Sequence, residues 1–103
     1  MRKLAWEYLL ANGSFTGLQN SDVGVGSGAE QLPATCNSSY WYEYHSWVSG
    51  SGYLALYSFR CLSGGKPPQG TQKCGWRVTM YPDGSEGWYC VGPDGTAACP
   101  GGC

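Results

Sequence analysis

Apolar residues recur every three to four positions over residues 2–11, the spacing that places side chains on one face of a helix. The predicted face consists of Leu4, Tyr8 and Ala11, with Ala5 and Leu9 beside it. Gly13 follows Asn12 and can adopt the left-handed conformation that ends a helix. A helix of this length is marginal in isolation. We therefore expect residues 2–11 to be the last turns of a longer helix whose earlier part has been removed.

From residue 39 onward the pattern changes to strict alternation, which indicates β-strands. Residues 40–45 and 53–60 form one predicted hairpin, joined by the Gly/Ser turn at 49–52. Residues 76–81 and 87–91 form a second hairpin around Pro82-Asp83-Gly84-Ser85, a sequence typical of tight turns.

Polar, Gly-rich segments separate these elements. The connection over residues 14–35 lacks periodicity and is long for a compact domain, which favours a functional role. Its apolar positions, expected to pin it to the core, are Phe15, Leu18, Val23, Val25 and Leu32. The pattern predicts an α+β fold in which the helix packs on a four-stranded antiparallel sheet, because the sheet offers the only surface that can bury the helix.

We interpret residues 1–103 as one domain. Its parts are the end of a helix (1–12), an αβ-loop (13–38), the sheet (39–91) and a C-terminal loop (92–103) bounded by disulfides.

Six cysteines in so short a chain indicate an oxidising compartment and a disulfide framework. Many pairings are formally possible. Chain order suggests that one hairpin joins Cys36 to Cys61, that the other joins Cys74 to Cys90, and that Cys99 and Cys103 close the terminal loop. This set of pairs is a hypothesis.

Zinc is the competing interpretation of the cysteines. It usually needs close Cys-x2-Cys pairs or histidine partners. The chain has no such pair, and its single histidine, His45, is far from any cysteine in the sequence. We therefore expect no metal and no other cofactor.

Only 13% of the residues are charged, and the net charge is −1. Binding to nucleic acid is not expected, because the basic surface that it requires is missing. No apolar run reaches the roughly 18 residues of a membrane helix. A secreted protein needs a targeting segment, so we infer that one preceded Arg2.

Aromatic residues are concentrated in residues 40–47, where an apolar body and a polar tip suit half-buried sheet positions. Two interpretations stay open. Trp41, Trp47 and Trp88 are candidates for a binding surface that contacts glycans or a partner protein. Alternatively, Tyr40, Tyr42 and Tyr44 pack on the helix, while Trp41 and Trp47 cover sheet edges or subunit contacts.

Catalysis is not expected. His45 has no evident base partner in the sequence. A histidine in such a position is more often a surface residue of a strand than a catalytic group. Glu7, Glu30, Glu43 and Glu86 lie on different predicted elements, without the pairing that acid–base work requires.

Two segments carry a resemblance to a known family. Residues 4–18 read as an aromatic-rich helix followed by Asn-Gly-Ser-Phe, and residues 87–91 are followed by Cys99 and Cys103. This arrangement resembles the soluble part of type IV pilins and pseudopilins, where the long helix ends and where the last strand meets a disulfide-bounded region. The family's N-terminal signature, with its cleavage site and long apolar helix, is absent from this sequence.

The resemblance implies a subunit of an extracellular filament that serves adhesion, motility, DNA uptake or secretion. It would be anchored in the inner membrane before assembly and would contact other pilin subunits through residues 14–35 and the stretch after Val91. Some pseudopilins carry calcium near the C-terminus, but Asp83, Glu86 and Asp94 are too sparse to predict such a site. The alternative function is a small secreted glycan-binding or adhesin domain.

Overall fold

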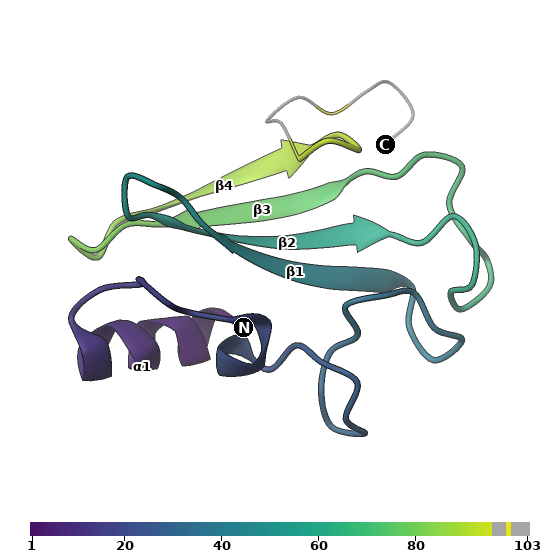
Figure 1. The fold of residues 1–103 in the computed structure, drawn as a ribbon. Helices are drawn as coiled ribbons and strands as arrows, with labels where there is room; N and C mark the ends of the chain where they lie inside the picture. Colours follow the sequence, from purple (N-terminus) through teal and green to yellow (C-terminus); the bar gives the residue numbers. More distant parts are fainter. Residues whose placement is uncertain (96–98, 100–103) are drawn as a thin grey trace.

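The computed structural model describes residues 1–95 and Cys99. Its elements, in chain order, are α1 (Arg2–Asn12), the 3₁₀ helix η1 (Asn20–Val23), β1 (Tyr42–Val48), β2 (Leu54–Arg60), β3 (Gly75–Met80) and β4 (Glu86–Val91). One helix packs against a four-stranded antiparallel sheet, which confirms the predicted α+β class (Figure 1). No helix within the described residues has the length and apolar character needed to span a bilayer.

The strands form a meander in the order β1-β2-β3-β4, and both predicted hairpins are present. Gly52 and Gly84 take φ values of 96° and 93° in the two hairpin turns. Such left-handed backbone is accessible to glycine without steric cost. The turn residues therefore fix the register that decides which side chains share a face.

The helix ends where the sequence predicts. Gly13 adopts a left-handed conformation, and its N–H donates to the Leu9 carbonyl at 2.7 Å. The predicted apolar face is wrong in part. Ala5 is fully buried, whereas Leu4 is 40% exposed and Ala11 is exposed. Apolar residues surround much of this short helix, so spacing alone did not decide which side meets the sheet.

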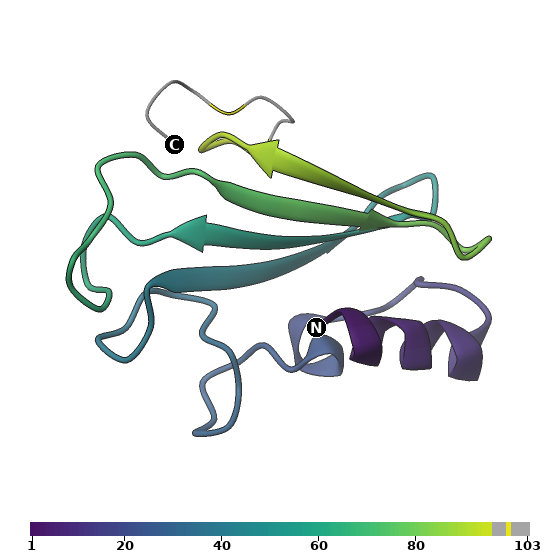
Figure 2. The same cartoon turned by 180° about the vertical axis from the view of Figure 1, so that it is seen from behind.

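The core lies between α1, the connection after it and one face of the sheet. Its buried residues are Ala5, Phe15, Leu18, Val23, Val25, Leu54, Leu56, Val78 and Met80. Four of the five apolar positions predicted to pin residues 14–35 are buried here, and Leu32 packs against the cluster. Both views place α1 and η1 on the same side of the sheet (Figures 1 and 2).

The connection over residues 14–35 is more ordered than its composition predicts. Asp22 and Gln19 form a capping box that starts η1. The Oδ1 atom of Asn20 accepts hydrogen bonds from the backbone N–H and the hydroxyl of Ser46, which fastens η1 to β1. A parallel bridge joins Val25 to Leu32. These local polar contacts replace the regular periodicity that sequence patterns detect.

The disulfide between Cys36 and Cys61 is confirmed, with Cα atoms 5.9 Å apart. Cys61 directly follows β2, and its N–H donates to the Trp41 carbonyl, so the chain before β1 lies beside the end of β2. This bridge ties the αβ-connection to the first hairpin.

The other two predicted pairs are wrong. Cys90 is bonded to Cys99, with Cα atoms 5.5 Å apart, so neither Cys74–Cys90 nor Cys99–Cys103 forms. The register gives the reason. Trp76 stands directly opposite Cys90, which leaves Cys74 one diagonal position away. Diagonal cross-strand neighbours are separated by roughly 7–8 Å, beyond ordinary disulfide reach. Cys74 is also disulfide-bonded, and Cys103 lies outside the described residues.

Candidate functional site

Two exposed tryptophans stand on the face of the sheet that packs on α1. Trp88 lies opposite the core residue Val78, and Trp76 precedes Val78 by two positions on β3, so all three point to the same face. Trp76 is 54% exposed and Trp88 is 58% exposed. The helix therefore covers only part of this face.

Two cavities border these rings. One, of about 270 Å³, opens beside the start of α1 and is lined by Met1, Arg2, Leu32, Tyr44, Leu56, Tyr57, Ser58, Trp76, Val78 and Trp88. The other, of about 380 Å³, is lined by Tyr42, Arg60, Gln69, Gly70, Thr71, Gln72, Cys74, Gly75, Trp76 and Cys90. Trp76 lines both, and we call the two cavities with this shared wall the tryptophan groove.

Glu86 holds one end of the groove in place. The Nε atom of Arg2 donates to both carboxylate oxygens of Glu86 at 2.9 Å. This hydrogen bond is the main reason that the pKa of Glu86 lies below its ordinary value, and the charge of Arg2 lowers the pKa further. Glu86 and Trp88 lie two positions apart on β4 and share a face, so the ion pair that anchors α1 stands at the Trp88 end of the groove.

Arg60 provides the charge at the other end. Its Nη2 donates to the Pro68 carbonyl at 2.9 Å, and the guanidinium lies 5.8 Å from the centre of the Tyr42 ring. No carboxylate of the described residues lies within ion-pair distance of Arg60. Tyr44 lines the cavity beside α1, and burial, followed by the neighbouring phenols of Tyr42 and Tyr40, raises its pKa.

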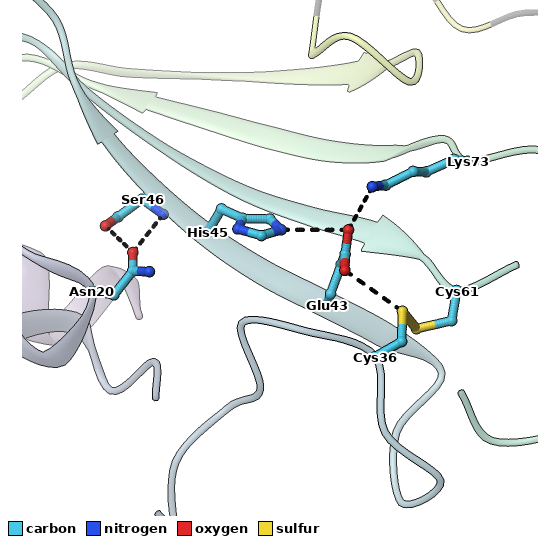
Figure 3. A network of polar contacts seen from close by, with 7 residues as sticks. All are labelled: Asn20, Cys36, Glu43, His45, Ser46, Cys61 and Lys73. Atoms are coloured by element: carbon cyan, nitrogen blue, oxygen red, sulfur yellow. Dashed lines mark hydrogen bonds and ion pairs between the residues drawn. A yellow bond between two sulfur atoms is a disulfide. The ribbon is translucent and has the colours of Figure 1, made fainter. Parts of the chain in front are cut away.

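The opposite face of the sheet carries a charge network centred on Glu43 (Figure 3). Oε1 of Glu43 lies 2.7 Å from Nζ of Lys73 and 3.4 Å from Nε2 of His45. Burial acts to raise the pKa of Glu43, but the hydrogen bonds and charges of Lys73 and His45 outweigh it, and the net pKa is lowered. Glu43 also lies 3.6 Å from the Cys36 sulfur.

Sequence reasoning found no partner for His45. The structure shows that its partner is Glu43, two positions earlier on the same strand. A carboxylate–imidazole pair is a common element of catalytic sites. Here the adjacent sulfur belongs to the Cys36–Cys61 disulfide and is therefore not a nucleophile. The contacts instead hold Lys73, which precedes β3, against β1.

The structure does not bring the three predicted binding residues together. Trp47 is on the opposite face from Trp88, where its ring centre lies 5.9 Å from that of Tyr53. Trp41 precedes β1, with Nζ of Lys66 4.1 Å from its ring centre. Tyr40, Tyr42 and Tyr44 were the residues proposed to pack on the helix, and of these three only Tyr44 contacts the core cluster.

Sequence reasoning also missed Trp76. Its alternation with Val78 on a predicted strand was the signal that would have paired it with Trp88 on one face.

The described residues contain no group of three or more histidine, cysteine, aspartate or glutamate side chains placed to hold a metal ion. Asp83 accepts hydrogen bonds from the hydroxyl and the backbone N–H of Ser85, which lower the pKa of Asp83 and close the β3–β4 turn. Glu86 is engaged by Arg2.

Comparisons with models of known protein families, with curated proteins and with solved structures gave no significant match.

Proposed function

We propose that this chain is a structural subunit of an extracellular type IV pilus or pseudopilus, acting by assembly and binding rather than by catalysis. One observation carries the proposal: a helix that ends at Gly13 leads, through a long connection, into a four-stranded antiparallel meander that packs on it. This order of elements is the one that the resemblance to pilins implies. The finer, pilin-like fold is part of the proposal.

The disulfides support the same interpretation. The Cys36–Cys61 bridge fastens the αβ-connection to the sheet, and the Cys90–Cys99 bridge fastens the segment after Val91 to β4. These two segments are the ones that would contact neighbouring subunits. Covalent links of this kind reduce the conformational freedom of surface segments, which suits contacts that must repeat along a filament.

The outward side of α1 offers a further contact surface. Leu10 is 86% exposed, whereas Ala5, on the opposite side of the helix, is fully buried. A helix that packs against copies of itself needs apolar side chains on its outer side. In the proposed filament the subunit would be anchored in the inner membrane by an apolar helix before assembly, and its partners would be further pilin subunits.

The experiment that tests this proposal is immunogold electron microscopy of the source cells with antibodies raised against residues 1–103. We expect gold particles along the length of thin surface filaments. Cells in which the gene is deleted provide the control for antibody specificity. Labelling that is confined to the medium or to the cell body, on cells that do display filaments, would contradict the proposal.

A further inference from the structure

The tryptophan groove has the composition of a ligand site rather than of a simple gap in the core. Trp76 and Trp88 lie on adjacent strands at diagonal positions, because Trp76 faces Cys90 and Trp88 faces Val78. Diagonal neighbours are close enough for large aromatic side chains to form one surface. More than half of each residue is exposed, so the surface consists of accessible ring carbon.

The two ends of the groove differ in charge. At the helix end, Arg2 is neutralised by Glu86. At the other end, within the described part of the chain, Arg60 has only the neutral Pro68 carbonyl and the Tyr42 ring as partners. A guanidinium has five N–H donors in a planar fork that matches a carboxylate. The groove is therefore complementary to a ligand with one negative group at the Arg60 end.

Polar side chains accompany Arg60. Gln69 and Thr71 line the same cavity of about 380 Å³, with Trp76 as its apolar wall. A mainly apolar pocket with a few convergent polar groups is the usual form of a small-ligand site. The ligand must combine flat apolar faces, hydroxyl groups and a carboxylate, and an acidic sugar has all three.

We propose that the tryptophan groove binds an acidic oligosaccharide. One sugar ring stacks on Trp76, its carboxylate pairs with Arg60, and the next ring extends across Trp88. Both indoles stand on paired strands of the sheet, and this preorganisation reduces the entropy lost on binding. The site does not depend on whether the chain assembles into a filament.

Two other ligand classes fit the groove less well. Single-stranded nucleic acid also stacks on aromatic rings, but it needs a row of cations for successive phosphates, and Arg2 is already paired. An apolar peptide would fill the helix end of the groove, but it has no anionic group to pair with the Arg60 guanidinium.

The test measures quenching of tryptophan fluorescence and calorimetric binding of a galacturonic acid tetramer to the 103-residue chain. The methyl ester of the same tetramer is the matched neutral ligand. We expect saturable binding of the acid, and binding of the ester that is weaker by about tenfold, as for the loss of one charge-assisted hydrogen bond. Arg60→Gln should weaken acid binding by a similar factor, and Trp76→Ala should abolish it.

Arg77→Gln and Trp47→Ala are the control variants, because both residues lie on the opposite face of the sheet. Both should bind the tetramer like the unchanged chain. Circular dichroism checks the fold of every variant. If Trp76→Ala unfolds, Trp76→Phe takes its place. This variant keeps an aromatic ring and should retain part of the affinity.

Several outcomes would overturn the proposal. For the ligands, these outcomes are equal affinity for the acid and its ester, or no saturable binding of either at millimolar concentration. For the variants, they are unchanged binding after Arg60→Gln and Trp76→Ala, or loss of binding in the folded Trp47→Ala chain.

Discussion

The guanidinium of Arg2 and the carboxylate of Glu86 form an ion pair across 84 sequence positions, with the Arg2 Nε atom 2.9 Å from both carboxylate oxygens. The contact joins the first turn of α1 to the start of β4. It also fixes the start of α1 beside the tryptophan groove, since Arg2 and Trp88 line the same cavity. Docking of the helix and shaping of the groove are therefore coupled through one side chain.

Glu86→Gln should loosen the start of α1 without unfolding the sheet. Hydrogen–deuterium exchange should become faster for amides near Arg2 and stay unchanged in β2. The pKa of Glu86 is lowered mainly by Arg2, so the same loosening should appear in the unchanged chain as the pH falls below the ordinary value of 4.5 and through the lowered pKa. Lys3→Gln is the control, and equal exchange in both variants would refute the role of this pair.

The disulfides make a prediction that peptide mapping tests directly. Non-reducing digestion should release one peptide pair that contains Cys36 with Cys61 and another that contains Cys90 with Cys99. In the loop-entropy model, replacing the first pair with alanine should cost about 3.5 kcal/mol and replacing the second about 2.5 kcal/mol. Denaturant unfolding measures both. A recovered Cys74–Cys90 peptide would show that the structural assignment is wrong.

Leu10→Lys should leave the monomer intact and impair filament formation if the proposed function is correct. Leu10 is 86% exposed, so its replacement removes little buried surface, and the stability change should stay within about 0.5 kcal/mol. A lysine at this position would place a charge in the helix contact between subunits. Electron microscopy counts filaments per cell, and Lys3→Gln serves as the matched surface control. Normal filament numbers in the Leu10→Lys strain would exclude this side of α1 from the subunit contact.

The elements were predictable because each one follows from a local signal. Alternation predicted the strands, the Pro82–Ser85 turn predicted the second hairpin, and Gly13 predicted the end of the helix. Each signal lies within a few residues of the structure that it determines.

The groove and two of the disulfide pairings were missed because they depend on register and on the face of the sheet. Trp47 and Trp88 look equivalent in sequence, yet they point to opposite faces, while Trp76 joins Trp88 across β3 and β4. Cys90 likewise lies on the predicted last strand but faces Trp76 rather than Cys74. A shift of one residue reverses such an assignment, and sequence alone did not fix it.

Glu43 should make stability depend on pH in the acidic range. Its pKa is lowered in the folded chain, so the contacts with Lys73 and His45 stabilise the fold above the ordinary value of 4.5 and are lost as the pH falls through the lowered pKa. Glu43→Gln should cost about 1 to 2 kcal/mol at pH 7 and progressively less towards pH 3.

Denaturant midpoints between pH 7 and pH 3 measure this difference. Lys73→Met should reproduce part of the effect, whereas Lys66→Met, which removes a charge beside Trp41, should not. A Glu43→Gln variant whose stability falls with pH as steeply as that of the unchanged chain would show that Glu43 is not the responsible group.

Gly75 is the position where the packing of β2 against β3 tolerates no side chain. A Cβ atom at Gly75 would collide with the backbone carbonyl of Ser58, which cannot move without breaking the β2–β3 ladder. Gly75→Ala should therefore destabilise the fold by about 3 kcal/mol, the upper end of the range for overpacking. Gly50→Ala is the matched control, because a Cβ atom there meets nothing within 4 Å and the glycine does not have a positive φ. Thermal unfolding should show a large fall in Tm for the first variant and almost none for the second. Equal Tm values would mean that the strands are spaced more widely at Gly75 than the structure places them.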